Sequence, residues 1–205
     1  TRHTIPHVDV KDFGDWMKYY RSIDFGTSHP TAVIFLAQDR DDNFYVFDEI
    51  RESNMLLDDL VKKVNERSWW LEFEYTIRDS AAKREWLEVE RLWLKTTPAD
   101  KRSKGIWDMS NRRTWILYLN TLFKNNKLFI SSRCQLLIKE LETHYYKEGW
   151  KRDWEVNKEN DDLLDALRYA IFMIKHNKTT HKNPLIDEVK QRYSHKEAKS
   201  SFNLL

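Results

Sequence analysis

Residues 19–37 read YYRSIDFGTSHPTAVIFLA, and this stretch decides the fold class. Residues 19–25 and 31–37 are rich in aromatic and β-branched side chains, which favour strands. Gly26 opens a short polar turn between them. Residues 44–50 repeat the apolar pattern after an acidic turn. The sequence therefore predicts three strands in an antiparallel meander.

Beyond the meander, helices and strands alternate along the chain. Amphipathic spacing predicts helices over residues 55–68 behind an Asn54 cap, then over 81–92, 104–123, 133–146 and 160–174. Further strands are expected over residues 73–79, 93–97, 128–131 and 150–156. This order predicts an α/β fold, with a mixed central sheet of three antiparallel strands followed by parallel strands and with helices on both faces.

The chain of 205 residues has a net charge of +2, so bulk charge does not point to a partner. We predict a lead-in segment over residues 1–18, one domain over 19–176 and a basic tail over 177–205. Residues 175–205 alone hold seven basic and three acidic side chains. The apolar run of residues 32–37, which no other run exceeds in length, is far shorter than a membrane-spanning helix.

Scarce glycine and cysteine exclude several classes of site. The four glycines are widely spaced, whereas phosphate-binding loops and dinucleotide-binding motifs need glycines close together. Cys134 is the single cysteine, which excludes an internal disulfide and a cysteine-rich zinc site. A motor ATPase and a Rossmann dehydrogenase are thereby excluded for this chain.

Two aspartates stand at the ends of predicted strands. Asp24 lies within an apolar strand just before a turn, where a carboxylate is costly to bury. An alternative is that it caps the turn at Gly26. Asp79 likewise ends a strand ahead of a helix, and its alternative role is helix capping. Either residue alone carries little information about function.

A third acidic group opens the last predicted helix, in the sequence NDDLLDALRY at residues 160–169. Asp161 and Asp162 suit the positive end of a helix dipole and need no further explanation. Asp165 lies a full turn inside the helix, on the face of the other two acids, where like charges repel. A bound cation would relieve that repulsion. Acids from three separate elements suit an oxygen-ligand Mg²⁺ or Mn²⁺ site.

Two of these stretches resemble motifs of a known family. Residues 23–32, IDFGTSHPTA, resemble its opening strand and turn, and residues 160–169 resemble its closing motif. Weaker matches at residues 78–80, 104–106 and 133–141 follow in the family's order. Over about residues 19–175 the chain is therefore similar to the nuclease domain of the large terminase subunit of tailed double-stranded DNA bacteriophages.

The resemblance implies an RNase H-like fold in which three acids hold two Mg²⁺ or Mn²⁺ ions. Matched by position, Asp24, Asp79 and Asp165 are the catalytic and metal-holding acids. Asp162 stands where many members have His, and is either an additional metal ligand or a solvent-facing acid. The implied activity is that of a two-metal endodeoxyribonuclease that cuts concatemeric viral DNA during genome packaging.

The resemblance also implies partners. Double-stranded DNA is the expected substrate, and the portal ring, the small terminase subunit and the ATPase domain of the full-length chain are the implied assembly partners. Since the family's motor precedes this domain, the sequence is interpreted as the nuclease half. We expect an isolated monomer that acts in the host cytoplasm without a membrane partner.

Basic side chains gather over residues 101–113 with a net charge of +4, a pattern typical of phosphate contacts. The DNA-binding candidates are Lys101, Arg102, Lys104, Arg112 and Arg113. A solvated helix start would have the same composition. The tail could bind DNA, dock on a portal or be disordered.

Two rival functions remain open from the sequence. One is another RNase H-like nuclease, such as a junction resolvase or an RNA–DNA hybrid hydrolase. The other is a non-catalytic module that docks on a portal. Most of the nine Trp are expected in the core or in helix packing rather than in base stacking.

Overall fold

The computed structural model describes residues 4–5, 13–14, 16–26, 28–99, 112–145 and 161–181. Within them, one sheet of seven strands has the order β1-β7-β4-β3-β2-β5-β6. The strands are β1 (Thr4–Ile5), β2 (Lys18–Asp24), β3 (Thr31–Gln38), β4 (Phe44–Glu52), β5 (Phe73–Arg78), β6 (Thr97–Pro98) and β7 (Leu128–Ser131).

The predicted meander is confirmed, since β3 pairs antiparallel with both β2 and β4. The later strands are parallel: β5 pairs with β2, β6 with β5, and β7 with β4. The sheet is therefore mixed, with the antiparallel strands at its centre. The parallel β2–β5 pairing brings the C-terminal ends of both strands to the same edge of the sheet.

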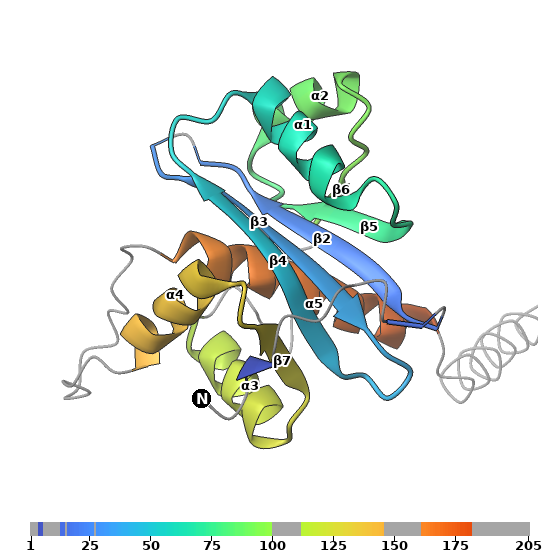
Figure 1. Ribbon diagram of the computed structural model, residues 1–205, viewed down its shortest axis with the longest axis vertical. Coiled ribbons are helices and arrows are strands. Elements are labelled where there is room, and N and C mark those ends of the chain that lie inside the picture. The colour runs from blue at the N-terminus through green and yellow to red at the C-terminus, as the bar shows by residue number, and fades with distance from the viewer. Residues whose placement is uncertain are drawn as a thin grey trace, which may run out of the picture. The chain divides into compact units, whose positions relative to one another are not determined.

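The helices are α1 (Leu57–Ser68), α2 (Lys83–Arg91), α3 (Arg112–Lys124), α4 (Gln135–Tyr145) and α5 (Asp162–His181). Figure 1 shows α1 and α2 on one side of the strands and α3 and α4 on the other. This arrangement explains why β3 is buried along its whole length, with no polar face for solvent. The expectation of helices on both faces is confirmed.

One face of the sheet packs on α1 and α2 through apolar side chains. Val33 and Phe35 of β3 lie in the same buried cluster as Leu60 and Val64 of α1. These helix residues recur at a spacing of four, which puts them on one side of α1. The apolar side chains that recur at helical spacing in the sequence thus form this half of the core.

The opposite face carries polar anchors for helices. Glu49 of β4 accepts hydrogen bonds from the backbone N–H groups of Leu136 (2.8 Å) and Leu137 (2.9 Å) at the start of α4. Helix N-termini have unsatisfied N–H groups, and a carboxylate from the sheet satisfies two of them here. A buried acid on β4 therefore fixes where α4 begins.

Several local predictions are wrong in position. Leu56, without a side-chain cap, occupies the cap position of α1, while Asn54 is in a left-handed turn with φ of 56°. The strand expected over residues 93–97 is displaced, because Trp93 turns with φ of 68° and β6 begins at Thr97. Positive φ is tolerated by Asn and costly for Trp, so the second turn carried no sequence signal.

Further differences concern the segments around the predicted domain. The lead-in contributes β1, which pairs parallel with β7 and extends the sheet. Helix α5 continues to His181, past the predicted end at residue 174. The chain divides into two units, Thr1–Phe172 and Met173–Leu205, and the division falls within α5. The strand predicted over residues 150–156 lies outside the described residues.

Many described Trp side chains are on the surface, contrary to expectation. Trp115 is buried, whereas Trp16, Trp69, Trp70 and Trp93 are exposed. A tryptophan count predicts a large apolar area and does not decide where that area lies. No described helix is both long enough and apolar enough to cross a bilayer.

Candidate active site

Asp24 is the last residue of β2 and lies opposite Ala32 of β3. Ile23 pairs with Arg78 of β5, which is parallel to β2, so Asp79 follows at the same edge of the sheet. Parallel neighbours end together, and this brings two acids that are distant in sequence onto adjacent strands. The predicted convergence of Asp24 and Asp79 follows directly from the sheet order.

The turn after Asp24 requires glycine. A Cβ on Gly26 would collide with the backbone carbonyl oxygens of His29 and Pro30. The Gly26 N–H donates to Thr31 Oγ1 at 3.2 Å. Since a threonine at the start of β3 satisfies this N–H group, the Gly26 amide does not depend on Asp24 as a cap.

Asp79 uses its two carboxylate oxygens for different contacts. Oδ1 accepts the Ala81 N–H at 3.0 Å, a local turn contact. Oδ2 accepts the Tyr169 hydroxyl at 3.2 Å, from α5. The cap position of α2 is occupied by Ala82 without a side-chain hydrogen bond, so the helix-capping alternative for Asp79 is wrong.

Helix α5 carries Asp165 and a positively charged arginine side by side. Arg168 Nη2 lies 3.0 Å from Asp165 Oδ2, three residues away on the same helix face. The same nitrogen donates to the Tyr169 hydroxyl at 3.4 Å. Burial and the nearby charges of Asp24 and Asp165 raise the pKa of Tyr169, so this phenol keeps its proton.

The electrostatics of Asp24 show that the acids converge. Burial, the largest cause, acts together with the charges of Asp165, Asp79 and Asp162 to raise the pKa of Asp24 to about 7, while Arg168 opposes the rise. Through-space coupling of this kind requires proximity. The structure thus brings acids from β2, from the loop after β5 and from α5 to one place.

Asp162, which also lies near Asp24, contacts the guanidinium group of a different arginine. Arg51 at the end of β4 donates to Asp162 Oδ2 from Nε (3.0 Å) and approaches it from Nη2 (2.9 Å). Arg51 Nε lies 3.2 Å from Glu140 Oε1 on α4. Asp162 is buried rather than exposed, so the solvent-facing alternative is wrong. Burial raises the pKa of Glu140 to about 8, although the Leu164 N–H and Arg51 favour its charged form.

The donor set suits a hard divalent cation, since its members are carboxylate oxygens on separate rigid elements. As they stand, no group of three or more Asp, Glu, His or Cys side chains in the described part of the chain is arranged to hold a metal ion. Asp165 is instead paired with Arg168, and Asp79 with Tyr169. Protein groups thus partly offset the clustered negative charge.

The predicted DNA-binding residues are not tested by this structure. Lys101, Arg102 and Lys104 lie outside the described residues. Arg112 and Arg113 open α3, and their side chains also lie outside the described part. The basic cluster therefore stays a prediction.

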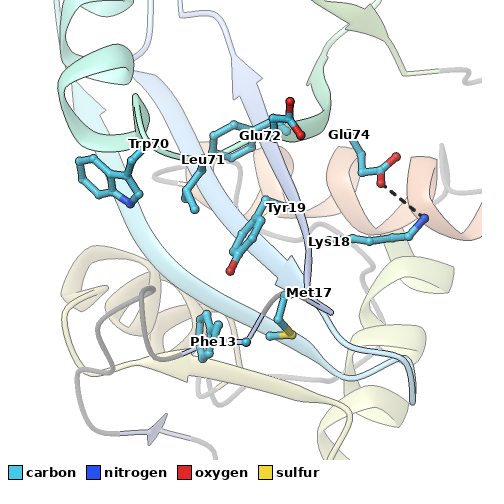
Figure 2. A pocket seen from close by; sticks show the side chains of 10 residues that line it. Phe13, Met17, Lys18, Tyr19, Trp70, Leu71, Glu72 and Glu74 are labelled. Atoms are coloured by element: carbon cyan, nitrogen blue, oxygen red, sulfur yellow. Dashed lines mark ion pairs between the residues drawn. The ribbon is translucent and has the colours of Figure 1, made fainter.

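A pocket of about 850 Å³ lies at the opposite end of β2 from the acids. Figure 2 shows Phe13, Met17 and Trp70 around it, with an ion pair between Lys18 and Glu74. Strand β2 begins at Lys18 and ends at Asp24, so roughly 20 Å of strand separates the two regions. This pocket is therefore distinct from the acidic site.

Sequence reasoning missed Arg51 and the contact role of Tyr169. Arg51 lies next to the last residue of β4, and its partners Glu140 and Asp162 lie 89 and 111 positions further along the chain, so no local pattern reveals it. Arg168 and Tyr169 follow Asp165 by three and four positions, a spacing that does predict a shared face. That signal was available within the closing motif.

Comparisons with known proteins agree with the geometry. Among solved structures, the large terminase nuclease domain of P22 is 19% identical, covers 84% of this chain and 87% of its own, and has a TM-score of 0.67. The nuclease domain of the large terminase of bacteriophage SPP1, solved with bound Mn, is 18% identical, with coverages of 80% and 90% and a TM-score of 0.58.

A large terminase from a thermophilic bacteriophage, solved in complex with ADP, is 19% identical with a TM-score of 0.64. The match covers 82% of this chain but only 41% of that terminase. No match is found among curated proteins. A family model described as the Terminase RNaseH-like domain matches residues 21–174, and the chain therefore belongs to that family, with an RNase H-like fold.

Proposed function

We propose that this chain is a divalent-metal-dependent DNA endonuclease whose catalytic acids are Asp24, Asp79 and Asp165. The observation that supports this most directly is the convergence of the three acids: Asp24 and Asp79 end up side by side at the ends of adjacent parallel strands, and Tyr169 links Asp79 to the helix that carries Asp165. A partly buried acid at a strand end, close to other acids, is unfavourable for folding alone. Such groups are typical of sites that bind a cation.

Asp24, Asp79 and Asp165 would hold Mg²⁺ or Mn²⁺ after exchanging their present protein contacts, and we propose two ions. Metal-bound structures of the SPP1 and G20c nuclease domains, solved with Mn and magnesium respectively, support divalent metal use. When bound, such ions supply an activated water and offset charge on the scissile phosphate.

The chain's own groups orient these acids. The Tyr169 hydroxyl keeps its proton and donates a hydrogen bond to Asp79 Oδ2, which fixes one carboxylate. Arg168 pairs with Asp165 and places a positive charge beside the acids. The oxygen Oδ1 of Asp79 is held by the turn before α2. Asp79 and Asp165 are thus each held by contacts of the protein, as a precise site requires.

By family membership we propose a role in viral genome packaging, in which concatemeric DNA is cut in the host cytoplasm. The portal ring, the small terminase subunit and an ATPase domain of a longer chain are the proposed partners. This chain spans only 41% of the ADP-bound terminase of the thermophilic bacteriophage, which supports the proposal of a longer protein. Lys101, Arg102, Lys104, Arg112 and Arg113 are the proposed DNA contacts.

The test is plasmid cleavage by the purified chain with Mn²⁺ or Mg²⁺. We expect Asp24→Asn, Asp79→Asn and Asp165→Asn each to reduce cleavage at least about a hundredfold, because residues that act as one unit fail together. Mn²⁺ binding measured by calorimetry should weaken in the same variants.

The matched control is Asp59→Asn, which removes the same charge from an exposed position in the first turn of α1. It should cleave like the wild type. Wild-type cleavage by Asp24→Asn or Asp165→Asn would exclude the assignment. Preference for a four-way junction or an RNA–DNA hybrid over plain duplex would favour the rival nuclease, and absence of Mn²⁺ binding would favour a docking module.

A further inference from the structure

A buried charged cluster lies beside the acids and joins three elements. It consists of Arg51 on β4, Glu140 on α4 and Asp162 at the start of α5, whose side chains are 19%, 5% and 11% exposed. Figure 1 shows α4 next to the first turns of α5. From this geometry we propose that Arg51, Glu140 and Asp162 are positioning residues that set where Asp165 projects toward Asp24, an inference that rests on the proposed function.

Glu140 determines where the first turn of α5 lies. Its Oε2 accepts the backbone N–H of Leu164 at 3.1 Å. Leu164 is the third residue of the helix, where N–H groups need an acceptor from outside the helix. A carboxylate also interacts favourably with this end of the helix dipole. Because Asp165 directly follows Leu164, Glu140 holds the backbone from which Asp165 projects.

Arg51 connects the first turn of α5 to the sheet, at the same register position as Asp24. Asp24 lies opposite Ala32, and Ala32 lies opposite Arg51, so the three residues share one row across β2, β3 and β4. Two guanidinium nitrogens contact Asp162 Oδ2, at 3.0 and 2.9 Å. The planar fork of arginine fixes orientation better than a flexible ammonium does. The spacing between α5 and the end of β2 therefore depends on Arg51.

This arrangement gives Asp162 a role other than metal ligation. Its carboxylate oxygen Oδ2 is engaged by Arg51, three residues before Asp165. Stability alone is a poor reason for such a cluster, because buried ion pairs are often no more stable than apolar packing. They are useful where one geometry must be specified, as around a metal-binding site, where outer residues tune affinity.

The experiment compares Arg51→Gln, Arg51→Lys, Asp162→Asn and Glu140→Gln with the wild type. Calorimetry measures Mn²⁺ binding, plasmid cleavage gives kcat and the KM for DNA, and thermal unfolding gives Tm. We expect Arg51→Gln and Asp162→Asn to weaken Mn²⁺ binding about ten- to a hundredfold and to lower kcat, with the KM for DNA within about twofold. Arg51→Lys should be intermediate, and Glu140→Gln keeps an acceptor for Leu164 in case the other variants fold poorly.

Arg67→Gln is the matched control. Arg67 lies on α1 and pairs at 2.9 Å with Asp48, which is on β4 like Arg51 but away from the acids. It should lower Tm and leave Mn²⁺ binding unchanged. If the wild type cleaves while Arg51→Gln and Asp162→Asn lose only Tm, the positioning inference is overturned. It is also overturned if Asp162→Asn abolishes Mn²⁺ binding and Arg51→Gln leaves it intact, since Asp162 is then a direct ligand. A wild type that neither binds Mn²⁺ nor cleaves overturns the proposed function itself.

Discussion

Tyr169 is the residue whose single atom connects two parts of the site. Its hydroxyl donates to Asp79 Oδ2 and accepts from Arg168 Nη2, so it lies between an acid and a cation. The aromatic ring is buried, and only the hydroxyl is polar. Removal of the oxygen alone would therefore disturb the orientation of Asp79 with little change in packing.

We expect Tyr169→Phe to reduce Mn²⁺-dependent cleavage about tenfold, because the variant loses one hydrogen bond to a charged group. The measurement is single-turnover cleavage at saturating DNA. Tyr45→Phe is the control, since Tyr45 donates to Asp39 at 3.0 Å in a distant hairpin. Equal rates for the wild type and Tyr169→Phe would contradict a role for this hydroxyl.

Gly26 is a residue whose absent side chain matters. We expect Gly26→Ala to destabilise the fold by about 1–3 kcal/mol, because the added carbon meets backbone oxygens that cannot move without distorting the turn. Urea unfolding measures this. Gly14→Ala is the comparison, since its Cβ would meet the half-exposed side chain of Trp16, which can turn away. A larger loss in Gly14→Ala would show that the turn is more adaptable than its geometry implies.

At the scale of elements, the β3–β4 hairpin is closed by one acid. The Asp39 carboxylate accepts hydrogen bonds from the backbone N–H groups of Asp41 (2.9 Å) and Asn43 (2.8 Å). It also accepts from the side-chain amide of Asn43 (2.6 Å) and from the Tyr45 hydroxyl (3.0 Å). Burial opposes the charged form, but these hydrogen bonds outweigh it and hold the pKa of Asp39 below its usual value.

The sign of the pH dependence follows from this shift. Because the folded-state pKa of Asp39 is lower than the unfolded one, its stabilisation is complete above pH 3.8 and is lost as pH falls through the folded value. We expect the free energy of unfolding of the wild type to exceed that of Asp39→Asn at pH 7, with the gap closing below about pH 4. Chemical denaturation across this range is the measurement, and a gap that widens in acid would refute the argument.

The elements themselves were largely predictable from sequence, for a physical reason. Strands β2, β3 and β4 carry long apolar runs, and α1 carries a clear four-residue period, so local signals agree with burial. The position of β6 was not predictable, because it depends on the left-handed turn at Trp93. The strand at β1 is two residues long and owes its existence to its neighbour β7.

The candidate site divides in the same way. Asp24 is conspicuous as an acid in an apolar strand, but the choice of Asp24, Asp79 and Asp165 as one set follows from the resemblance of residues 23–32 and 160–169 to motifs of the terminase nuclease family. Arg51 could not be proposed from sequence, since an arginine at a strand end is ordinarily solvated and its partners lie on helices far along the chain. Contacts that depend on tertiary structure leave no mark on local composition.

At the scale of the whole molecule, a net charge of +2 gives no general attraction to DNA. Any affinity must come from local basic groups. We expect Lys101→Ala, Arg102→Ala and Lys104→Ala combined to weaken binding to all duplexes alike, and to lower the slope of log K against log salt by about 1 for each phosphate that is no longer neutralised. Fluorescence anisotropy over a salt series measures this, with Lys62→Ala, an exposed lysine on α1, as the control. An unchanged slope would place the DNA contacts elsewhere.

The long separation between Asp24 and its helical partner has a consequence for how the protein is made. Ribosomes add roughly 5–20 residues per second, so Asp165 follows Asp79 out of the exit tunnel only after about 4–17 seconds. The central strands can pair in that interval, while Asp24 and Asp79 still lack the helix that carries Asp165. A nascent chain of this kind carries an incomplete acid set, so the proposed nuclease activity would arise only when synthesis has passed α5.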